Sequence, residues 1–154
     1  MKMGDHLLAF GGSLTGVAAL LHVAIILGGP DWYRFFGAGE RMAWFAARGS
    51  IYPTVITAGI AAVLGIWSLY AFSGAGAIRR LPFLRPVLTL IAAAYLARGI
   101  LGIPAVMLMD DPYANELKAR MTFMAASSAI CIVLGFCYAA GAARVWKASS
   151  ASRT

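Results

Sequence analysis

Four long apolar stretches dominate the pattern of hydrophobic and polar positions. They cover about residues 7–27, 53–72, 87–109 and 121–143. A helix rises about 1.5 Å per residue and crosses the roughly 30 Å hydrocarbon core of a bilayer in about 20 residues, so each stretch is long enough to span a membrane. The pattern therefore predicts an all-α protein, a four-helix transmembrane bundle forming a single domain over residues 1–154.

Two shorter polar stretches lie between these spans. Residues 31–50 mix charges of both signs with aromatic side chains. Because Trp and Tyr favour the headgroup level, we expect an interfacial cap on the outer side, with a short helix from about Glu40 to Arg48. Residues 110–120 begin with aspartates and a proline, which suit a helix start, and we expect them to form the outward-projecting first turns of the fourth helix.

Composition and charge support a membrane location. The chain is 61% hydrophobic and only 12% charged, whereas a soluble domain carries about 25% charged residues. The net charge of +7 does not indicate nucleic-acid binding, because the basic surplus gathers at one side of the predicted membrane. That side carries Arg79, Arg80, Arg85, Arg144, Lys147 and Arg153. Basic residues concentrate on the cytoplasmic side of membrane proteins, so we expect both termini to be cytoplasmic.

The most unusual residue is Arg98, near the middle of the third apolar stretch. A guanidinium at that depth costs about 2.5 to 3.5 kcal/mol on insertion scales, so it should face the bundle interior and find acceptors. Gly99, Gly102 and Pro104 follow within two helical turns, a composition that resembles the interrupted helices lining cavities in membrane proteins. Arg98 is therefore either the anchor of a ligand or a structural tie between helices.

The predicted topology gathers other polar residues above Arg98 on the outer side. The candidate ligand-binding set is Arg98, His22, Glu40, Asp31, Tyr52 and Thr54. Arg98 suits a carboxylate, a phosphate or a quinone oxygen, and the cap is where we expect it to meet a carboxylate, from Glu40 or Asp31, or else from bound lipid. His22 is the candidate catalytic acid or base; the alternative is an ordinary bundle histidine bonded to a backbone carbonyl.

The small number of histidines limits how the chain could bind a haem cofactor. The chain has two histidines, His6 and His22, 16 residues apart on one predicted helix and so about 24 Å apart. They cannot ligate both faces of one haem within a protomer, although a single axial ligand at His22 stays open, as does a bound quinone. Too few His, Cys and carboxylate residues share one side to predict a metal site.

One face of the fourth span is built from small residues. They recur every four positions, at Ser127, Cys131, Gly135 and Ala139. Such a face lets another helix approach closely, either inside the bundle or in a second protomer. We therefore hold open a homo-oligomer or a larger membrane complex assembled through this helix.

The outline of the chain, with four spans, inside termini, an outward polar cluster and the Arg98–Gly99 step, resembles the DoxX-like four-helix bacterial membrane proteins. It is more distantly similar to the EXPERA group. Either resemblance implies a lipid- or quinone-sized ligand, or an accessory role in a membrane complex, here in the bacterial inner membrane. The sequence leaves two other functions open: a membrane-embedded enzyme acting on a lipid-like substrate at the outer leaflet, and an oligomeric transporter or channel subunit.

Overall fold

The computed structural model describes residues 3–150, and this part of the chain is helical and contains no strand. Its helices are α1 (Met3–Gly28), α2 (Pro30–Phe35), α3 (Glu40–Ala47), α4 (Tyr52–Ala75), α5 (Leu84–Leu108), α6 (Pro112–Lys118) and α7 (Met121–Ser150). The four long helices, α1, α4, α5 and α7, are each long and apolar enough to cross a membrane. The predicted all-α bundle with four spans is confirmed, and the chain is an integral membrane protein. Arg153 of the basic tail lies outside the described residues.

Local sequence signals explain where these helices begin and end. α4 begins with Pro53 in its first turn and ends at Gly76, which adopts a left-handed φ of 78° that favours glycine. α1 ends at Gly28, where Gly29 takes a φ of 71° and Pro30 begins α2. α5 continues through Pro104 to Leu108, so the proline does not end the helix.

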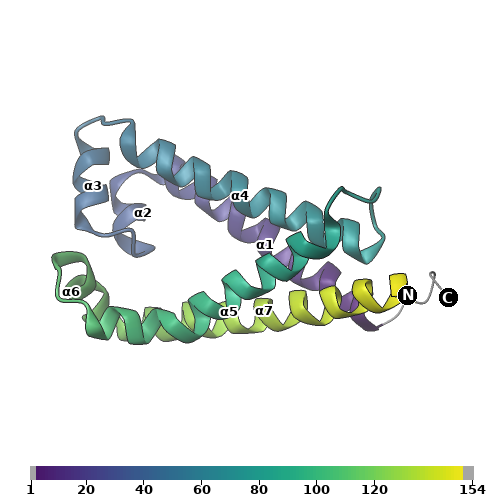
Figure 1. The fold of residues 1–154 in the computed structure, drawn as a ribbon. Helices are drawn as coiled ribbons and strands as arrows, with labels where there is room; N and C mark the ends of the chain where they lie inside the picture. The colour runs from purple at the N-terminus through teal and green to yellow at the C-terminus, as the bar shows by residue number, and fades with distance from the viewer. Residues whose placement is uncertain (1–2, 151–154) are drawn as a thin grey trace.

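The long helices form two antiparallel pairs, α1 with α4 and α5 with α7 (Figure 1). Glycines allow each pair to pack closely. A Cβ atom at Gly12 would lie 2.8 Å from the Ala71 Cβ of α4, and one at Gly135 would lie 2.6 Å from the Leu96 Cγ of α5. The small face of α7 is thus used inside the chain at Gly135, and its use between protomers stays a prediction.

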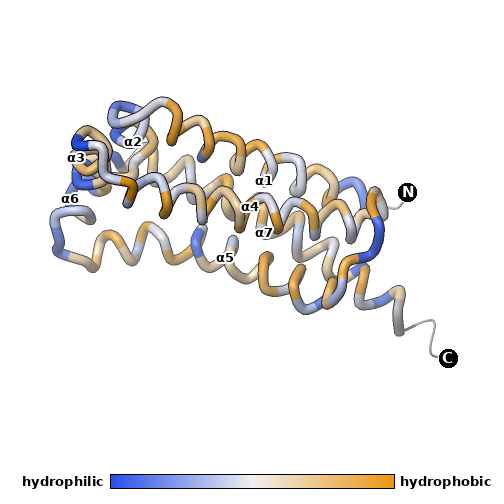
Figure 2. Tube along the Cα trace, turned by 90° about the horizontal axis from the view of Figure 1, so that it is seen from above, coloured by the Kyte–Doolittle hydropathy of each residue, from blue (hydrophilic) through white to orange (hydrophobic). Residues whose placement is uncertain are grey.

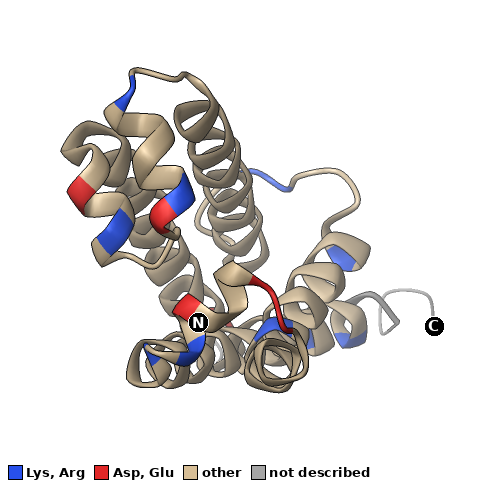
Figure 3. Cartoon of the chain, turned by 90° about the vertical axis from the view of Figure 1, so that its left-hand side faces the viewer, with Lys and Arg blue, Asp and Glu red and all other residues tan. Residues whose placement is uncertain are grey.

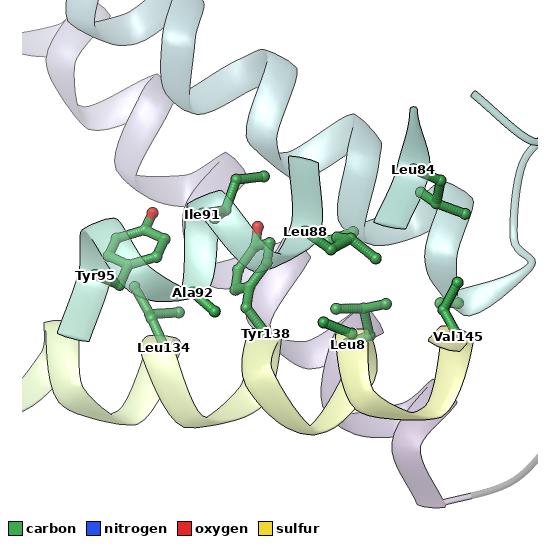
Figure 4. Packing of buried hydrophobic residues seen from close by; sticks show 12 residues of the cluster. Leu8, Leu84, Leu88, Ile91, Ala92, Tyr95, Leu134, Tyr138 and Val145 are labelled. Atoms are coloured by element: carbon green, nitrogen blue, oxygen red, sulfur yellow. The ribbon is translucent and has the colours of Figure 1, made fainter. Parts of the chain in front are cut away.

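The two pairs meet at one end and diverge toward the other (Figure 1). We call the end where α1 and α5 begin and α4 and α7 end the closed end, and the opposite end the open end. The main hydrophobic core lies in the closed half, where Leu8, Leu88, Ile91 and Tyr138 are completely buried (Figure 4).

Polar contacts also join the two pairs in the closed half. The Tyr138 hydroxyl lies 3.1 Å from Thr15 Oγ1 and 3.1 Å from the Trp67 carbonyl oxygen, and the Tyr95 hydroxyl lies 3.1 Å from the same Thr15 atom. Nearer the end, Arg144 forms an ion pair with Asp5. Hydrogen bonds between buried side chains hold transmembrane helices together where apolar burial alone gives little preference.

A cap of short helices covers the open end. Hydrophilic residues gather at the two ends of the molecule, and charges of both signs lie on the cap (Figures 2 and 3). The short helix predicted from about Glu40 to Arg48 is confirmed as α3, and residues 30–35 add a further helix, α2, which we did not predict. The prediction that residues 110–120 continue into the fourth span is wrong, because the chain turns at Ala119 and Arg120 and leaves α6 as a separate helix. Its predicted N-cap is confirmed, since Asp111 Oδ1 accepts a hydrogen bond of 2.9 Å from the Ala114 amide.

Candidate functional site

A cavity of about 740 Å³ lies between the two helix pairs beneath the cap. Helices of both pairs and all three cap helices contribute to its lining, which is mainly apolar. Representative apolar residues are Leu21, Ile25, Ile60, Phe123, Met124 and Ile130. The volume falls in the range of about 300 to 1,000 Å³ that is usual for small-molecule sites. Polar groups that reach this cavity are therefore candidates for orienting a ligand.

Arg98 of α5 is one of these polar residues. Its side chain runs along α5 toward Gly102, whose missing Cβ would lie only 2.1 Å from the Arg98 Nη1 atom. In the described part of the chain its one hydrogen bond goes to Ser128 Oγ, at 3.5 Å, and no carboxylate pairs with it. A bond of that length is at the weak limit for nitrogen and oxygen. Most of the five N–H donors of Arg98 therefore have no acceptor among the described residues.

His22 of α1 lines the same cavity from the other helix pair. Its Nδ1 atom lies 2.7 Å from the Ala18 carbonyl oxygen. A carbonyl oxygen only accepts, so Nδ1 carries the hydrogen and donates it. In the neutral ring Nε2 is then an acceptor, available to a hydroxyl donor or to a metal. His22 therefore makes the hydrogen bond to a backbone carbonyl that is expected of an ordinary bundle histidine, and its Nε2 atom can still accept a second hydrogen bond.

Tyr33 of α2 is a cavity residue that sequence reasoning missed. The residue is 2% exposed, and its hydroxyl has no hydrogen-bond partner among the described residues. A buried hydroxyl without a partner costs about 1 to 3 kcal/mol, so a ligand that brought a polar atom to it would recover part of that cost. Tyr33 sits in an aromatic run that we interpreted only as an interfacial anchor. A helical register for residues 30–35, with Tyr33 on its inner face, would have singled it out.

The predicted carboxylates lie elsewhere. Glu40 and Asp31 both pair with Arg34, whose Nη2 is 2.8 Å from Glu40 Oε1 and whose Nη1 is 3.0 Å from Asp31 Oδ1. The expected contact of either carboxylate with Arg98 is therefore absent, because Arg34 lies within six residues of both and satisfies them locally. The hydrogen bond from Arg34 lowers the pKa of Glu40 below its ordinary value, and Glu40 in turn raises the pKa of Arg34.

Tyr52 and Thr54 also lie outside the cavity. Tyr52 is 53% exposed and its ring packs against Phe45, with the ring centroids 5.8 Å apart. Thr54 is exposed on α4. Thr57, one turn further along, is the threonine of α4 that lines the cavity, and it is buried. The structure thus brings Arg98 and His22 together on one cavity and separates them from the other four candidates.

Within the cap, the segment of α2 and α3 is tied to α6 and the turn after it by four hydrogen bonds, which we call the latch. The Glu40 amide donates to Glu116 Oε2 at 2.9 Å, and the Tyr113 hydroxyl donates to the Gly37 carbonyl at 3.1 Å. Arg120 donates to the carbonyl oxygens of residues 34 and 35, at 2.8 Å for the latter. Burial raises the pKa of Tyr113, which keeps its hydroxyl protonated and able to donate. The latch joins the cap helices at the open end of the cavity, where Gly37 and Tyr113 also belong to its lining.

Metal and cofactor chemistry has few groups to draw on. Among residues 3–150, no group of three or more His, Cys, Asp and Glu side chains is arranged to hold a metal ion. His22 Nε2 is one potential axial nitrogen, while His6 lies near the start of α1, at the closed end. Comparisons of the chain with protein-family models, with curated proteins and with solved structures found no match.

Proposed function

We propose that this protein binds one amphiphile, lipid-like or quinone-like, in the open-end cavity, with the anionic or carbonyl end of the ligand at Arg98. The observation that carries the proposal is the convergence of Arg98 and His22 on a cavity whose walls are mainly apolar and include Tyr33, a tyrosine whose buried hydroxyl has no partner among the described residues. Such a combination matches a molecule with a small polar head and a long apolar body.

The charge of Arg98 is the strongest argument for a ligand. Its position along α5 is ten residues from Leu108, about 15 Å from that end of the helix. A guanidinium at this depth needs strong acceptors, and the described chain offers it one hydroxyl at 3.5 Å. A carboxylate, phosphate or carbonyl oxygen of a ligand would supply the missing acceptor, and a bidentate contact would use the planar fork of the guanidinium.

The other two polar groups define what the head of the ligand must offer. His22 Nε2 accepts from a donor, so it favours a hydroxyl group on the ligand. The Tyr33 hydroxyl can donate or accept. A ligand head with an oxygen for Arg98 and a hydroxyl for His22 would satisfy both sides of the cavity.

The proposal extends to the orientation in the membrane. We infer that the closed end faces the cytoplasm of a bacterial cell, because the basic surplus lies there, and that the cavity opens in the outer half of the inner membrane. An amphiphile of the outer leaflet would reach the cavity from the side or through the latched cap.

The test compares Arg98→Leu with Arg98→Lys and with Arg48→Leu. Arg48 stacks on Trp44 at 3.7 Å on the cap and controls for the loss of one surface arginine. Native mass spectrometry of protein extracted gently from its membrane would detect a co-purifying amphiphile, and a dansyl-labelled long-chain fatty acid would serve as a probe. We expect Arg98→Leu to lose both signals, Arg98→Lys to retain part, and Arg48→Leu to match the wild type. Equal signals in all four proteins would refute the proposal.

A second function, an enzyme acting on a lipid-like substrate, is favoured by one observation. The backbone bond at Nδ1 fixes the His22 ring with Nε2 as the potential base. Incubating the protein with lipids extracted from its own membrane, followed by mass spectrometry of the lipids, would detect a product. A product that His22→Gln fails to form would establish the enzyme, and no product with either protein would leave binding alone.

A further inference from the structure

The closed end has a charge imbalance that takes no part in the proposed binding at the open-end cavity. Among the described residues it carries one carboxylate, Asp5, which is paired with Arg144. Its cationic residues are Arg79, Arg80, Arg85, Arg144 and Lys147. At the open end, acidic and basic residues are equal in number. The closed end therefore has a strong positive potential that a negatively charged partner would reduce.

The turn that carries most of these arginines is held in place. Ser73 Oγ donates to the Arg79 carbonyl at 3.1 Å and accepts from the Leu81 amide at 2.9 Å. The Tyr70 hydroxyl donates to the Pro82 carbonyl at 3.1 Å. These bonds fix the backbone on both sides of Arg80, so the arginine is presented from a defined turn.

Two adjoining hollows flank this turn. The first, of about 260 Å³, lies between Arg80 and Arg85 and has apolar walls that include Phe83, Leu84 and Val145. The second, of about 300 Å³, shares Arg80 with the first and is also lined by Arg144. A hollow with two guanidinium groups and apolar walls can hold a group that is anionic at one end and apolar at the other.

The two arginines of the first hollow have no acidic partner among residues 3–150. The Arg85 guanidinium lies over the Trp146 ring at 5.5 Å, which positions it without neutralising it. Phe83, beside them, is 79% exposed and takes a left-handed φ of 53°, which is uncommon for an aromatic residue. An exposed aromatic ring at the end of a transmembrane helix is suited to the membrane interface.

We propose that the hollow between Arg80 and Arg85 binds the phosphate headgroup of an anionic phospholipid, whose acyl chains lie along α5. Leu90, about one turn beyond the hollow on α5, is 67% exposed and offers an apolar surface for such chains. The site is separate from the open-end cavity and independent of its ligand. Each arginine near an anionic lipid contributes about fivefold in affinity, so the pair accounts for about 30-fold.

The experiment titrates detergent-solubilised full-length protein with phosphatidylglycerol or phosphatidylcholine and counts bound lipids by native mass spectrometry. We compare Arg80→Gln/Arg85→Gln with Arg41→Gln/Arg48→Gln, a control that also removes two arginines stacked on aromatic rings. We expect the wild type to bind phosphatidylglycerol more tightly than phosphatidylcholine. The affinity for phosphatidylglycerol should fall about 30-fold in Arg80→Gln/Arg85→Gln and stay unchanged in Arg41→Gln/Arg48→Gln. Circular dichroism confirms that the variants remain folded.

Two outcomes would overturn the inference. Equal loss of phosphatidylglycerol binding in both double variants would show a general effect of charge. Competition by inorganic phosphate as effectively as by the lipid would identify a soluble anion as the ligand. Arg98→Leu leaves the closed end unchanged, so adding Arg80→Gln/Arg85→Gln to that variant should still weaken phosphatidylglycerol binding about 30-fold, whatever happens at the cavity.

Discussion

Two glycines of α5 provide a sharp test of the position of Arg98. A Cβ atom at Gly102 would lie 2.1 Å from Arg98 Nη1 and 3.5 Å from Ser128 Oγ. Ordinary contact begins at 3.4 Å, so Gly102→Ala moves the guanidinium nitrogen by at least about 1.3 Å, from 2.1 to 3.4 Å. The side chain is flexible, and alanine is better than glycine in a helix by about 1 kcal/mol. We expect a fold at least as stable as the wild type.

The same substitution should weaken ligand binding. A hydrogen bond to a charged group contributes about 1.5 to 3 kcal/mol, so losing the alignment of one such bond lowers affinity about 10- to 150-fold. Binding of the dansyl-labelled fatty acid measures this loss directly.

Gly99→Ala is the matched control, since it adds the same methyl group one turn earlier. Its Cβ would lie 3.0 Å from the Ile132 amide nitrogen and 3.0 Å from the Ser128 carbonyl oxygen, which are backbone atoms of α7. These cannot move aside, so α5 and α7 must separate at a cost of about 1 to 3 kcal/mol. Unfolding by titration with sodium dodecyl sulfate should show destabilisation in Gly99→Ala only. If Gly102→Ala binds the ligand as tightly as the wild type does, the Arg98 guanidinium does not contact the ligand from the position that the structure gives it.

Two further predictions concern the closed half and the Arg34–Glu40 ion pair of the cap. Tyr138→Phe removes the hydroxyl that contacts Thr15 and Trp67. It should lower the free energy of unfolding by about 1 kcal/mol and leave ligand binding unchanged. An unchanged free energy of unfolding would mean that these hydrogen bonds do not stabilise the protein. Arg34 lowers the pKa of Glu40 below its ordinary value of 4.5. The stabilisation of the fold by the Arg34–Glu40 pair is therefore complete above pH 4.5 and is lost as the pH falls through the lowered pKa. Hydrogen exchange of residues 30–40 should therefore stay slow from neutral pH to about 5 and accelerate below, and an acceleration already at pH 6 would contradict the pairing.

Much of the fold follows from the sequence alone. Uncharged apolar runs of membrane-spanning length identify the four spans, and Pro53 and Gly76 fix the ends of α4 because their backbone preferences are local. The pairing of the helices could not be predicted, because hydropathy does not record which apolar face meets which. The contact of Gly12 with Ala71 depends on a packing choice that many glycine-containing helices could satisfy.

The candidate site was predictable in part. Arg98 and His22 stand out because polar groups are rare inside spans, and both line the cavity. The role of Asp31 and Glu40 was misjudged because their nearest cation, Arg34, is a close neighbour in sequence and outcompetes a distant one. Tyr33 was missed because an aromatic residue between two spans is more often an anchor than a pocket residue.

The most direct test of the central claim is to find where an amphiphile touches the protein. Photoreactive methionine, incorporated during growth and irradiated in the native membrane, labels what lies beside each methionine. Met42 and Met124 line the cavity, whereas Met107 is 58% exposed on the outside of α5. We predict lipid-like adducts on Met42 and Met124 that disappear in Arg98→Leu, with adducts on Met107 unchanged. Adducts on Met107 alone, or cavity adducts that persist in Arg98→Leu, would contradict a ligand anchored by Arg98.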